Sequence, residues 1–341
     1  MKKWITGALA ILLGIVSIAV PFSGMHTAEA KTTEETARKL NIVTTIFPEY
    51  DWTRAILGDR MDDMELTMLL DNGTDLHSFQ PAVKDIMKVS SCDLLIYVGG
   101  ESDQWIEDAL ESAQNKDMKT INLMEVLGDT IKEEETVEGM QESGHDHDHD
   151  HEDEHDHESE DEKEYDEHVW TSIRNASMIC DAIAETLEEM DPENKEIYAS
   201  NAATYQAELL NLDTEYQNTI DNAKQDTLLF ADRFPFRYLV DDYGLNYYAA
   251  FSGCSAESEA SFKTVTFLAG KLDELGLKTV LTIEKSDDRI AQTVIENTVT
   301  KDQKILELNS MQSITSDEIA DGVTYLSVME DNLNVLKEAL N

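Results

Sequence analysis

Short apolar runs alternate with segments of helical periodicity along most of the chain. The β-rich runs are residues 42–47, 65–70, 94–98 and 119–123 in the first half, and 227–231, 245–251, 278–284 and 304–308 in the second. Helical patterns lie between or after them at 49–57, 81–90, 102–113, 234–243, 258–276, 287–300 and 316–340. Strands that alternate with helices form parallel sheets, because each connection must cross one face of the sheet. The pattern therefore predicts an α/β protein with two four-stranded lobes.

Two helical patterns lie between these two sets of strands. The first covers 172–190, and the second covers 193–222 with apolar residues every three or four positions. The second helix would be about 45 Å long at 1.5 Å per residue, which is enough to reach from one lobe to the other. We expect an N-terminal lobe at 31–192, an interlobe helix at 193–222 and a C-terminal lobe at 223–341.

The first 30 residues have the pattern of an export signal. Lys2 and Lys3 precede an apolar run that ends at Val20, and residues 28–30 form an A-x-A cleavage site. An uncleaved anchor is the alternative, since the run of about 17 residues is near the lower limit for crossing a membrane. No Cys lies near the end of the run, so the lipid-modified Cys of bacterial lipoproteins is not expected. The pattern predicts an exported protein, periplasmic or extracellular, either released or tethered to the membrane.

The composition excludes several classes of function. The chain has 26 Lys and Arg against 71 Asp and Glu, for a formal net charge of −45. Such a surface repels nucleic acid and attracts cations. Three cysteines (Cys92, Cys180 and Cys254) are too few for a disulfide scaffold, and we expect buried free thiols. Common hydrolase and nucleotide-binding motifs are missing, which argues against an enzyme.

Residues 133–167 differ from the rest of the chain. Fourteen acidic residues fall between Asp146 and Glu167, and apolar residues are almost missing, so burial cannot order this segment. We predict a disordered insertion. Imidazoles close to carboxylates hold Zn²⁺ and related ions in many weak arrangements, which suggests metal capture. The six histidines of this segment are His145, His147, His149, His151, His155 and His157.

Only His77 and His168 belong to the predicted folded body. His77 follows the second predicted strand, and His168 precedes the helix at 172–190. Ligands of open α/β sheets bind beyond the carboxyl ends of the strands, and imidazole is the commonest ligand of zinc. Two unrelated surface or capping histidines remain the alternative at this point.

Four stretches together resemble the zinc/manganese solute-binding proteins of ABC importers. They are IVTTIFPEYDWTRAILGDR (42–60), DLHSFQPAVKDI (75–86), DEHVWTSIRNA (166–176) and RYLVDDYGL (237–245), and the resemblance covers about residues 41–341. It implies a rigid interlobe helix, a metal in the cleft between the lobes, and delivery to a membrane permease driven by an ATPase. It also assigns His77 and His168 as the first two ligands.

The second lobe departs from the family pattern. The third-ligand position falls on Arg233, which cannot ligate a metal, and the fourth falls on Asn309, which offers only a neutral oxygen. Asp232 could replace them if the strand end is bulged, or Glu284 could reach the metal. Water and a histidine of the 133–167 segment could also complete the shell, or the cleft could have lost its metal.

A buried Arg233 would also need a carboxylate partner, because an unpaired buried charge is costly. Glu257, Glu259 and Glu284 are the predicted candidates for that partner.

These observations lead to one hypothesis and its rivals. We expect the metal-binding component of an ABC importer, a monomer that captures Zn²⁺ and has a permease and an ATPase as partners. Mn²⁺ stays an alternative if Asp232 or Glu284 ligates, because manganese prefers oxygen ligands. An extracellular zinc store or adhesin-like protein without transport is another alternative. A metallohydrolase is disfavoured, since it would need a positioned base beside the metal.

Overall fold

The computed structural model describes residues 39–141, 164–255 and 259–341. The predicted export signal and the six histidines of the acidic segment therefore lie outside the described residues. Residues Lys39–Asn341 form one compact unit. Within the described ranges, each helix is too short or too polar to cross a membrane.

Two four-stranded parallel sheets form the framework of this unit. The first contains β1 (Leu40–Thr44), β2 (Met64–Met68), β3 (Leu94–Tyr97) and β4 (Lys119–Asn122) in the order β2-β1-β3-β4. The second contains β5 (Thr227–Phe234), β6 (Asn246–Ser252), β7 (Thr279–Ile283) and β8 (Lys304–Leu308) in the order β6-β5-β7-β8. The predicted fold class, two α/β lobes, is confirmed.

The helices cover both sheets. Those of the first half are α1 (Phe47–Leu57), α2 (Val83–Ser91), α3 (Gln104–Glu111), α4 (Leu123–Leu127) and α5 (Ile173–Met190). They are followed by α6 (Lys195–Asp221), α7 (Arg237–Tyr243), α8 (Phe262–Leu275), α9 (Arg289–Glu296), α10 (Ser316–Ala320) and α11 (Tyr325–Ala339).

Two predicted helices differ from the observed ones. The helix expected at 316–340 is two helices, because the chain turns at Gly322 with φ of 102° and Thr324 caps a new start by accepting a hydrogen bond from the Ser327 N–H. The helix expected from residue 234 begins only at Arg237, since β5 continues to Phe234.

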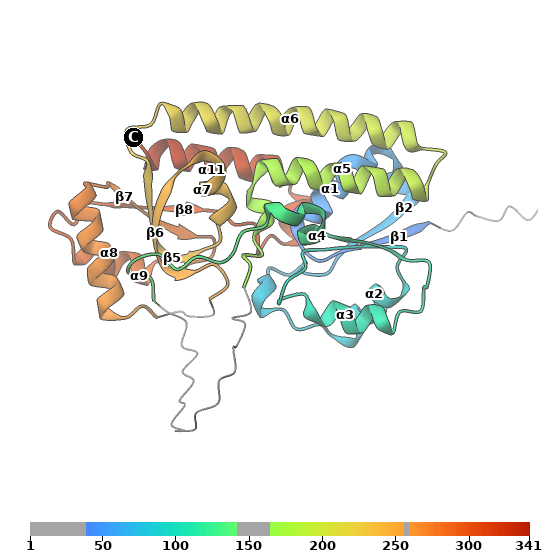
Figure 1. Cartoon of the computed structure of the whole chain (residues 1–341), viewed down its shortest axis with the longest axis horizontal. Coiled ribbons are helices and arrows are strands. Elements are labelled where there is room, and N and C mark those ends of the chain that lie inside the picture. The colour runs from blue at the N-terminus through green and yellow to red at the C-terminus, as the bar shows by residue number, and fades with distance from the viewer. Residues whose placement is uncertain (1–38, 142–163, 256–258) are drawn as a thin grey trace, which may run out of the picture. The chain divides into compact units, whose positions relative to one another are not determined.

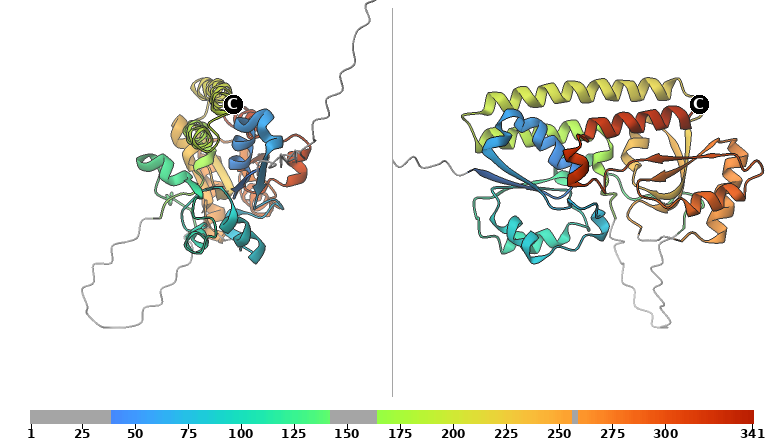
Figure 2. Two further views of the ribbon diagram at one scale, coloured as in Figure 1. Left: turned by 90° about the vertical axis from the view of Figure 1, so that its right-hand side faces the viewer. Right: turned by 180° about the vertical axis from the view of Figure 1, so that it is seen from behind.

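Helix α6 runs along both lobes, on the same side of the sheets as α5 and α11 (Figures 1 and 2). Its 27 residues correspond to about 40 Å. The Asn201 amide donates to the carbonyl of Ile56 in α1 at 2.9 Å, and the Tyr216 hydroxyl donates to the carbonyl of Met329 in α11 at 2.6 Å. One helix therefore packs against elements of both lobes. The lobe boundaries drawn from the sequence stay a prediction.

The inner strands β3, β5 and β7 are buried on both faces, which explains why they are continuous apolar runs. In β5, Leu228 and Phe230 join the main core, whereas Leu229 and Ala231 join a second cluster under α8 and α9. Successive side chains of a strand point to opposite faces, and a parallel sheet has helices on both. The core of the second lobe thus has two layers of side chains around one sheet.

The ends of the acidic segment are packed against the body. Glu133 and Tyr165 form an antiparallel bridge, and Met140 is buried in the main core. The predicted disordered insertion over 133–167 is therefore wrong at both ends, because backbone pairing and an apolar anchor order them. Residues 142–163 lie outside the described part.

Trp170 ties the two lobes together beside the predicted ligand His168. Its indole Nε1 donates to the carbonyl of Ser310, which follows β8, at 2.8 Å. The Tyr325 hydroxyl of α11 donates to the carbonyl of Trp170 at 2.9 Å. Trp170, Ser310 and Tyr325 are all fully buried, so both hydrogen bonds are shielded from water.

Replacing Trp170→Phe should lower the free energy of unfolding by about 1–3 kcal/mol more than Trp52→Phe, measured by urea denaturation. Both tryptophans are fully buried, so the loss of ring volume is matched. Among the described residues, however, the Trp52 Nε1 has no hydrogen-bond partner. Equal losses in the two variants would show that the bond to Ser310 contributes nothing.

Candidate metal centre

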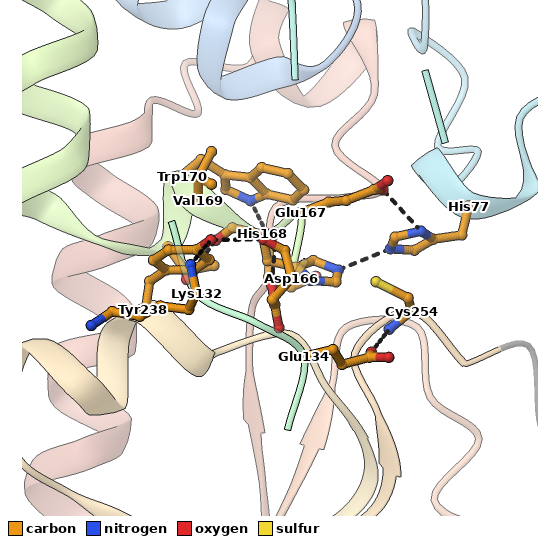
Figure 3. A network of polar contacts seen from close by, with 12 residues as sticks. His77, Lys132, Glu134, Asp166, Glu167, His168, Val169, Trp170, Tyr238 and Cys254 are labelled. Atoms are coloured by element: carbon orange, nitrogen blue, oxygen red, sulfur yellow. Dashed lines mark hydrogen bonds and ion pairs between the residues drawn. The ribbon is translucent and has the colours of Figure 1, made fainter. Parts of the chain in front are cut away.

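The two histidines that the sequence singled out meet in the structure. The Nε2 atoms of His77 and His168 lie 3.0 Å apart (Figure 3). His77 lies on the short 3-10 turn Leu76–Ser78 that follows β2, and His168 directly precedes the 3-10 turn Val169–Thr171 that leads into α5. The His77 side chain is 11% exposed and that of His168 is fully buried.

Asp166 determines the orientation of the His168 ring. Its Oδ1 lies 2.9 Å from His168 Nδ1 and also accepts the His168 backbone N–H at 2.8 Å. The Tyr238 hydroxyl holds the same loop by donating to the carbonyl of Asp166 at 2.8 Å. Because Asp166 holds Nδ1, Nε2 is the ring atom that faces His77, as in metal sites where a carboxylate orients a ligating histidine.

His77 is held in a corresponding way. Its Nδ1 lies 2.8 Å from the Ser102 hydroxyl and 3.5 Å from a carboxylate oxygen of Glu167. Its backbone N–H donates to Asp75 Oδ1 at 2.9 Å, so Asp75 caps the turn that carries the ring. These contacts occupy Nδ1 and direct Nε2 toward His168.

The protonation of the two rings differs. Burial, together with the neighbouring His168, lowers the pKa of His77 to about 3, so this ring is neutral at pH 7. Burial also disfavours a charge on His168, but Asp166 outweighs it and raises the pKa of His168 above its ordinary value. A metal ion therefore displaces no proton from His77.

A third potential ligand comes from the second lobe. The Cys254 sulfur, His77 and His168 offer ligand atoms that all lie within 4.8 Å of one another. Cys254 follows β6 and is a free thiol, but it is only partly buried, whereas Cys92 and Cys180 are fully buried as predicted. Cys254 was not among the ligands predicted from the sequence. One feature of the sequence could have indicated it: Cys254 follows the second strand of the second lobe, as His77 follows the second strand of the first lobe.

Gly253 permits the close approach of this strand end to His168. A Cβ at Gly253 would lie 2.9 Å from His168 Cε1 and 2.9 Å from the carbonyl oxygen of Phe234. Any larger residue would push the histidine ring or the backbone aside. The chain thus needs glycine here to place the second lobe against the ligands of the first.

Arg233, where the resemblance places the third ligand, forms an ion pair with Asp75 across 2.8 Å. Burial would raise the pKa of the Asp75 carboxyl, but Arg233 outweighs it and holds that pKa below its ordinary value. The two side chains are 22% and 17% exposed. Because Asp75 also caps the turn of His77, the ion pair connects the second lobe to a candidate ligand.

The predicted partners of Arg233 were different. Glu284 accepts hydrogen bonds from the Ser310 N–H at 2.7 Å and the Ser310 hydroxyl at 2.8 Å, so its carboxylate is engaged elsewhere. The backbone carbonyl of Glu259 accepts a bond from Gln141, and Glu257 lies outside the described residues. The prediction omitted Asp75, which is distant in sequence and belongs to the other lobe.

The tentative second-lobe ligands are not brought to the two histidines. Strand β5 does have a register shift between Phe230 and Arg233, but the Asp232 carboxylate accepts the Arg233 N–H at 2.8 Å. Asn309 Oδ1 accepts the N–H of Met311 at 2.7 Å. Within the described ranges, neither these two residues nor Glu284 belongs to the group that could hold a metal.

The site opens into an acidic pocket of about 270 Å³. Its lining is rich in carboxylates, which attract cations, and consists of His77, Glu101, Ser102, Glu164, Tyr165, Glu167 and Cys254. Two nitrogens bound to one tetrahedral zinc at ~2.05 Å lie about 3.3 Å apart. The observed 3.0 Å between the two Nε2 atoms is close to that separation, so the residues present fit a zinc ion.

Comparison with known proteins agrees with this chemistry. The profile of a family described as the periplasmic component A of the zinc-uptake complex matches residues 42–339. The zinc-binding protein AdcA of Streptococcus pyogenes is 29% identical over 336 residues, which cover 96% of this chain. This chain spans only 61% of the length of that relative.

Two further matches cover most of both chains that are compared. The high-affinity zinc uptake system protein ZnuA of Bacillus subtilis is 28% identical, with 99% of this chain and 98% of that protein covered. The crystal structure of the Zn(II)-bound ZnuA-like domain of Streptococcus pneumoniae AdcA superposes with a TM-score of 0.67 at 27% identity. That match covers 89% of this chain and 99% of the other.

Replacing Gly253→Ala should weaken Zn²⁺ binding at least tenfold, or about 1.4 kcal/mol, because the new methyl group would displace His168. Competition with a chelating dye measures this affinity. Gly270→Ala is the matched control, since a Cβ in that position of α8 meets nothing within 4 Å. Unchanged affinity in Gly253→Ala would contradict the close packing at the centre.

Replacing Asp75→Asn should weaken Zn²⁺ binding about tenfold, because Arg233 would keep its charge near the centre without a carboxylate. In an Arg233→Gln background, the same Asp75→Asn replacement should weaken Zn²⁺ binding less. Zinc titrations of the two single variants and the double variant measure this coupling. An Asp75→Asn effect of equal size in both backgrounds would show that the ion pair does not influence the metal.

Proposed function

Because this chain belongs to the family of the periplasmic component A of zinc-uptake complexes, we propose that it captures Zn²⁺ outside the cytoplasm and delivers it to a membrane permease driven by an ATPase. The observation that carries the proposal is the pair of Nε2 atoms at 3.0 Å, each on a ring whose Nδ1 is occupied. Both Nε2 atoms point to one place, which suits a metal ion held between them.

Zinc is the proposed metal rather than manganese. Imidazole suits zinc, whereas manganese prefers carboxylate, carbonyl and water ligands. Asp232 and Glu284, on which the manganese alternative depended, make hydrogen bonds elsewhere. The names of the relatives from Streptococcus pyogenes and Bacillus subtilis also refer to zinc.

The proposed location is outside the cytoplasm, as the export pattern of residues 1–30 and the family description suggest. The proposed partners are a permease and its ATPase, and a monomer is the proposed state. We propose a binding role rather than a catalytic one, because the family is a component of an uptake system.

The histidines of the acidic segment have a proposed accessory role. They would capture metal weakly and pass it to the centre. Glu164 and Tyr165, which directly follow residues 142–163, line the pocket over His77 and Cys254. The segment therefore joins the body beside the proposed site, which supports a transfer over a short distance.

The proposal is tested in a protein from which residues 142–163 have been deleted. Calorimetric titration of this protein should show one tight Zn²⁺ site and fewer weak sites than the full chain. His77→Ala combined with His168→Ala in the same background should lose the tight site, since both nitrogen ligands are gone. Retention of one Zn²⁺ with unchanged affinity would mean that the centre lies elsewhere.

Delivery is tested separately from binding. Zinc-limited growth of a host that expresses this chain with a permease and an ATPase of the family should depend on the chain. The double histidine variant should fail to support that growth. Tight zinc binding without any effect on growth would favour a storage or adhesin-like role.

A further inference from the structure

We propose that Cys254 binds the metal as a thiolate, so that two imidazole nitrogens from the first lobe and one sulfur from the second hold the ion. This inference rests on the proposed function, because it concerns the same centre. It assigns to Cys254 the role that the family pattern gives to the position of Arg233.

The geometry of the three ligand atoms supports this assignment. The Cys254 sulfur and the ligand nitrogens of His77 and His168 lie within 4.8 Å of one another. In a tetrahedral zinc site, with ~2.3 Å to sulfur and ~2.05 Å to nitrogen, a sulfur and a nitrogen are about 3.6 Å apart. A movement of roughly 1 Å therefore closes the site, and Figure 3 shows the sulfur directed toward the space between the two rings.

The pairing of β5 with β6 explains how Cys254 could replace a ligand at the position of Arg233. Arg233 pairs with Phe251 and Phe234 pairs with Ser252, so the ends of the two strands lie side by side. Cys254 lies two residues after Ser252, the last residue of β6. Arg233 is directed to Asp75 instead of the metal. A ligand missing from the end of one strand is thus replaced from the end of its neighbour.

The Cys254 backbone is held at a fixed place beside the two histidines. Its backbone N–H donates to Glu134 Oε1 at 3.3 Å. A bound Zn²⁺ would take Cys254 as the thiolate, because coordination removes the thiol proton. The sulfur–metal bond replaces the S–H bond, and the proton leaves to solvent through the acidic pocket.

A sulfur ligand would also determine which metals the protein accepts. Thiolate favours softer ions such as Zn²⁺ and Cd²⁺ and disfavours Mn²⁺, which takes oxygen ligands. We therefore expect Cys254 to act as a specificity-determining ligand of the centre.

Cobalt replacement tests the sulfur ligand directly. The full-length protein loaded with Co²⁺ should show a thiolate-to-metal charge-transfer band in the near ultraviolet, to which imidazoles and carboxylates do not contribute. Cys254→Ser should lose the band and bind Cd²⁺ at least tenfold more weakly, with a smaller loss for Mn²⁺. Cys180→Ser is the matched control and should keep the band, because Cys180 is buried in α5.

Thiol alkylation provides a second measurement that needs no variant. Cys254 is the partly exposed thiol of the three, so iodoacetamide should modify it first in the folded protein. One equivalent of Zn²⁺ should slow that modification at least tenfold.

The outcomes separate this inference from the proposed function. No charge-transfer band in the wild type, a band that persists in Cys254→Ser, or alkylation that Zn²⁺ does not slow would overturn the thiolate ligand. If the tight Zn²⁺ site is still lost in the double histidine variant, the proposed function stands without Cys254. If the wild type has no tight Zn²⁺ site at all, the proposed function itself fails.

Discussion

The contact between the two lobes is the constraint on which the proposed metal centre depends. His77 and His168 belong to the first lobe, whereas Gly253, Cys254 and Arg233 belong to the second. Helix α6 packs against elements of both lobes. Because a helix satisfies its backbone hydrogen bonds internally, it resists stretching and holds the lobes at a fixed distance. The bond from Trp170 to Ser310 adds a tie directly beside the ligands. Without these ties, ligand atoms from different lobes would not stay within a few ångströms of one another.

The charges around the centre are arranged for one additional cation. Asp166 orients His168, Glu167 lies beside His77, and Asp75 is already neutralised by Arg233. One oxygen of Glu167 has no hydrogen-bond partner among the described residues, although it lies 3.5 Å from His77 Nδ1. Buried carboxylates of this kind are costly unless a positive charge compensates them. A divalent ion between the rings would supply that charge.

The two lobes place the candidate ligands by the same topological rule. Both sheets have the strand order second-first-third-fourth, and His77 follows β2 as Cys254 follows β6. Parallel strands direct their carboxyl ends to one edge of a sheet, and the loops there are free to carry function. With two such edges facing each other, each lobe can contribute ligands without changes to its core.

The sequence alone determined the framework and two of the three candidate ligands. Short apolar runs between helical segments predicted all eight strands to within a few residues, because a strand that packs in a core leaves a local pattern. The resemblance identified His77 and His168, which the structure brings together.

Only the tertiary structure decided the contribution of the second lobe. The ion pair of Arg233 with Asp75 joins residues 158 positions apart, and Cys254 meets His168 only because glycine lets their strand and loop approach. Met140, within the 133–167 segment, packs in the main core, which the composition of that segment did not indicate. Periodicity records whether a residue is buried, but not which distant residue it meets. That choice depends on how the lobes pack, and the packing arises from the whole chain at once.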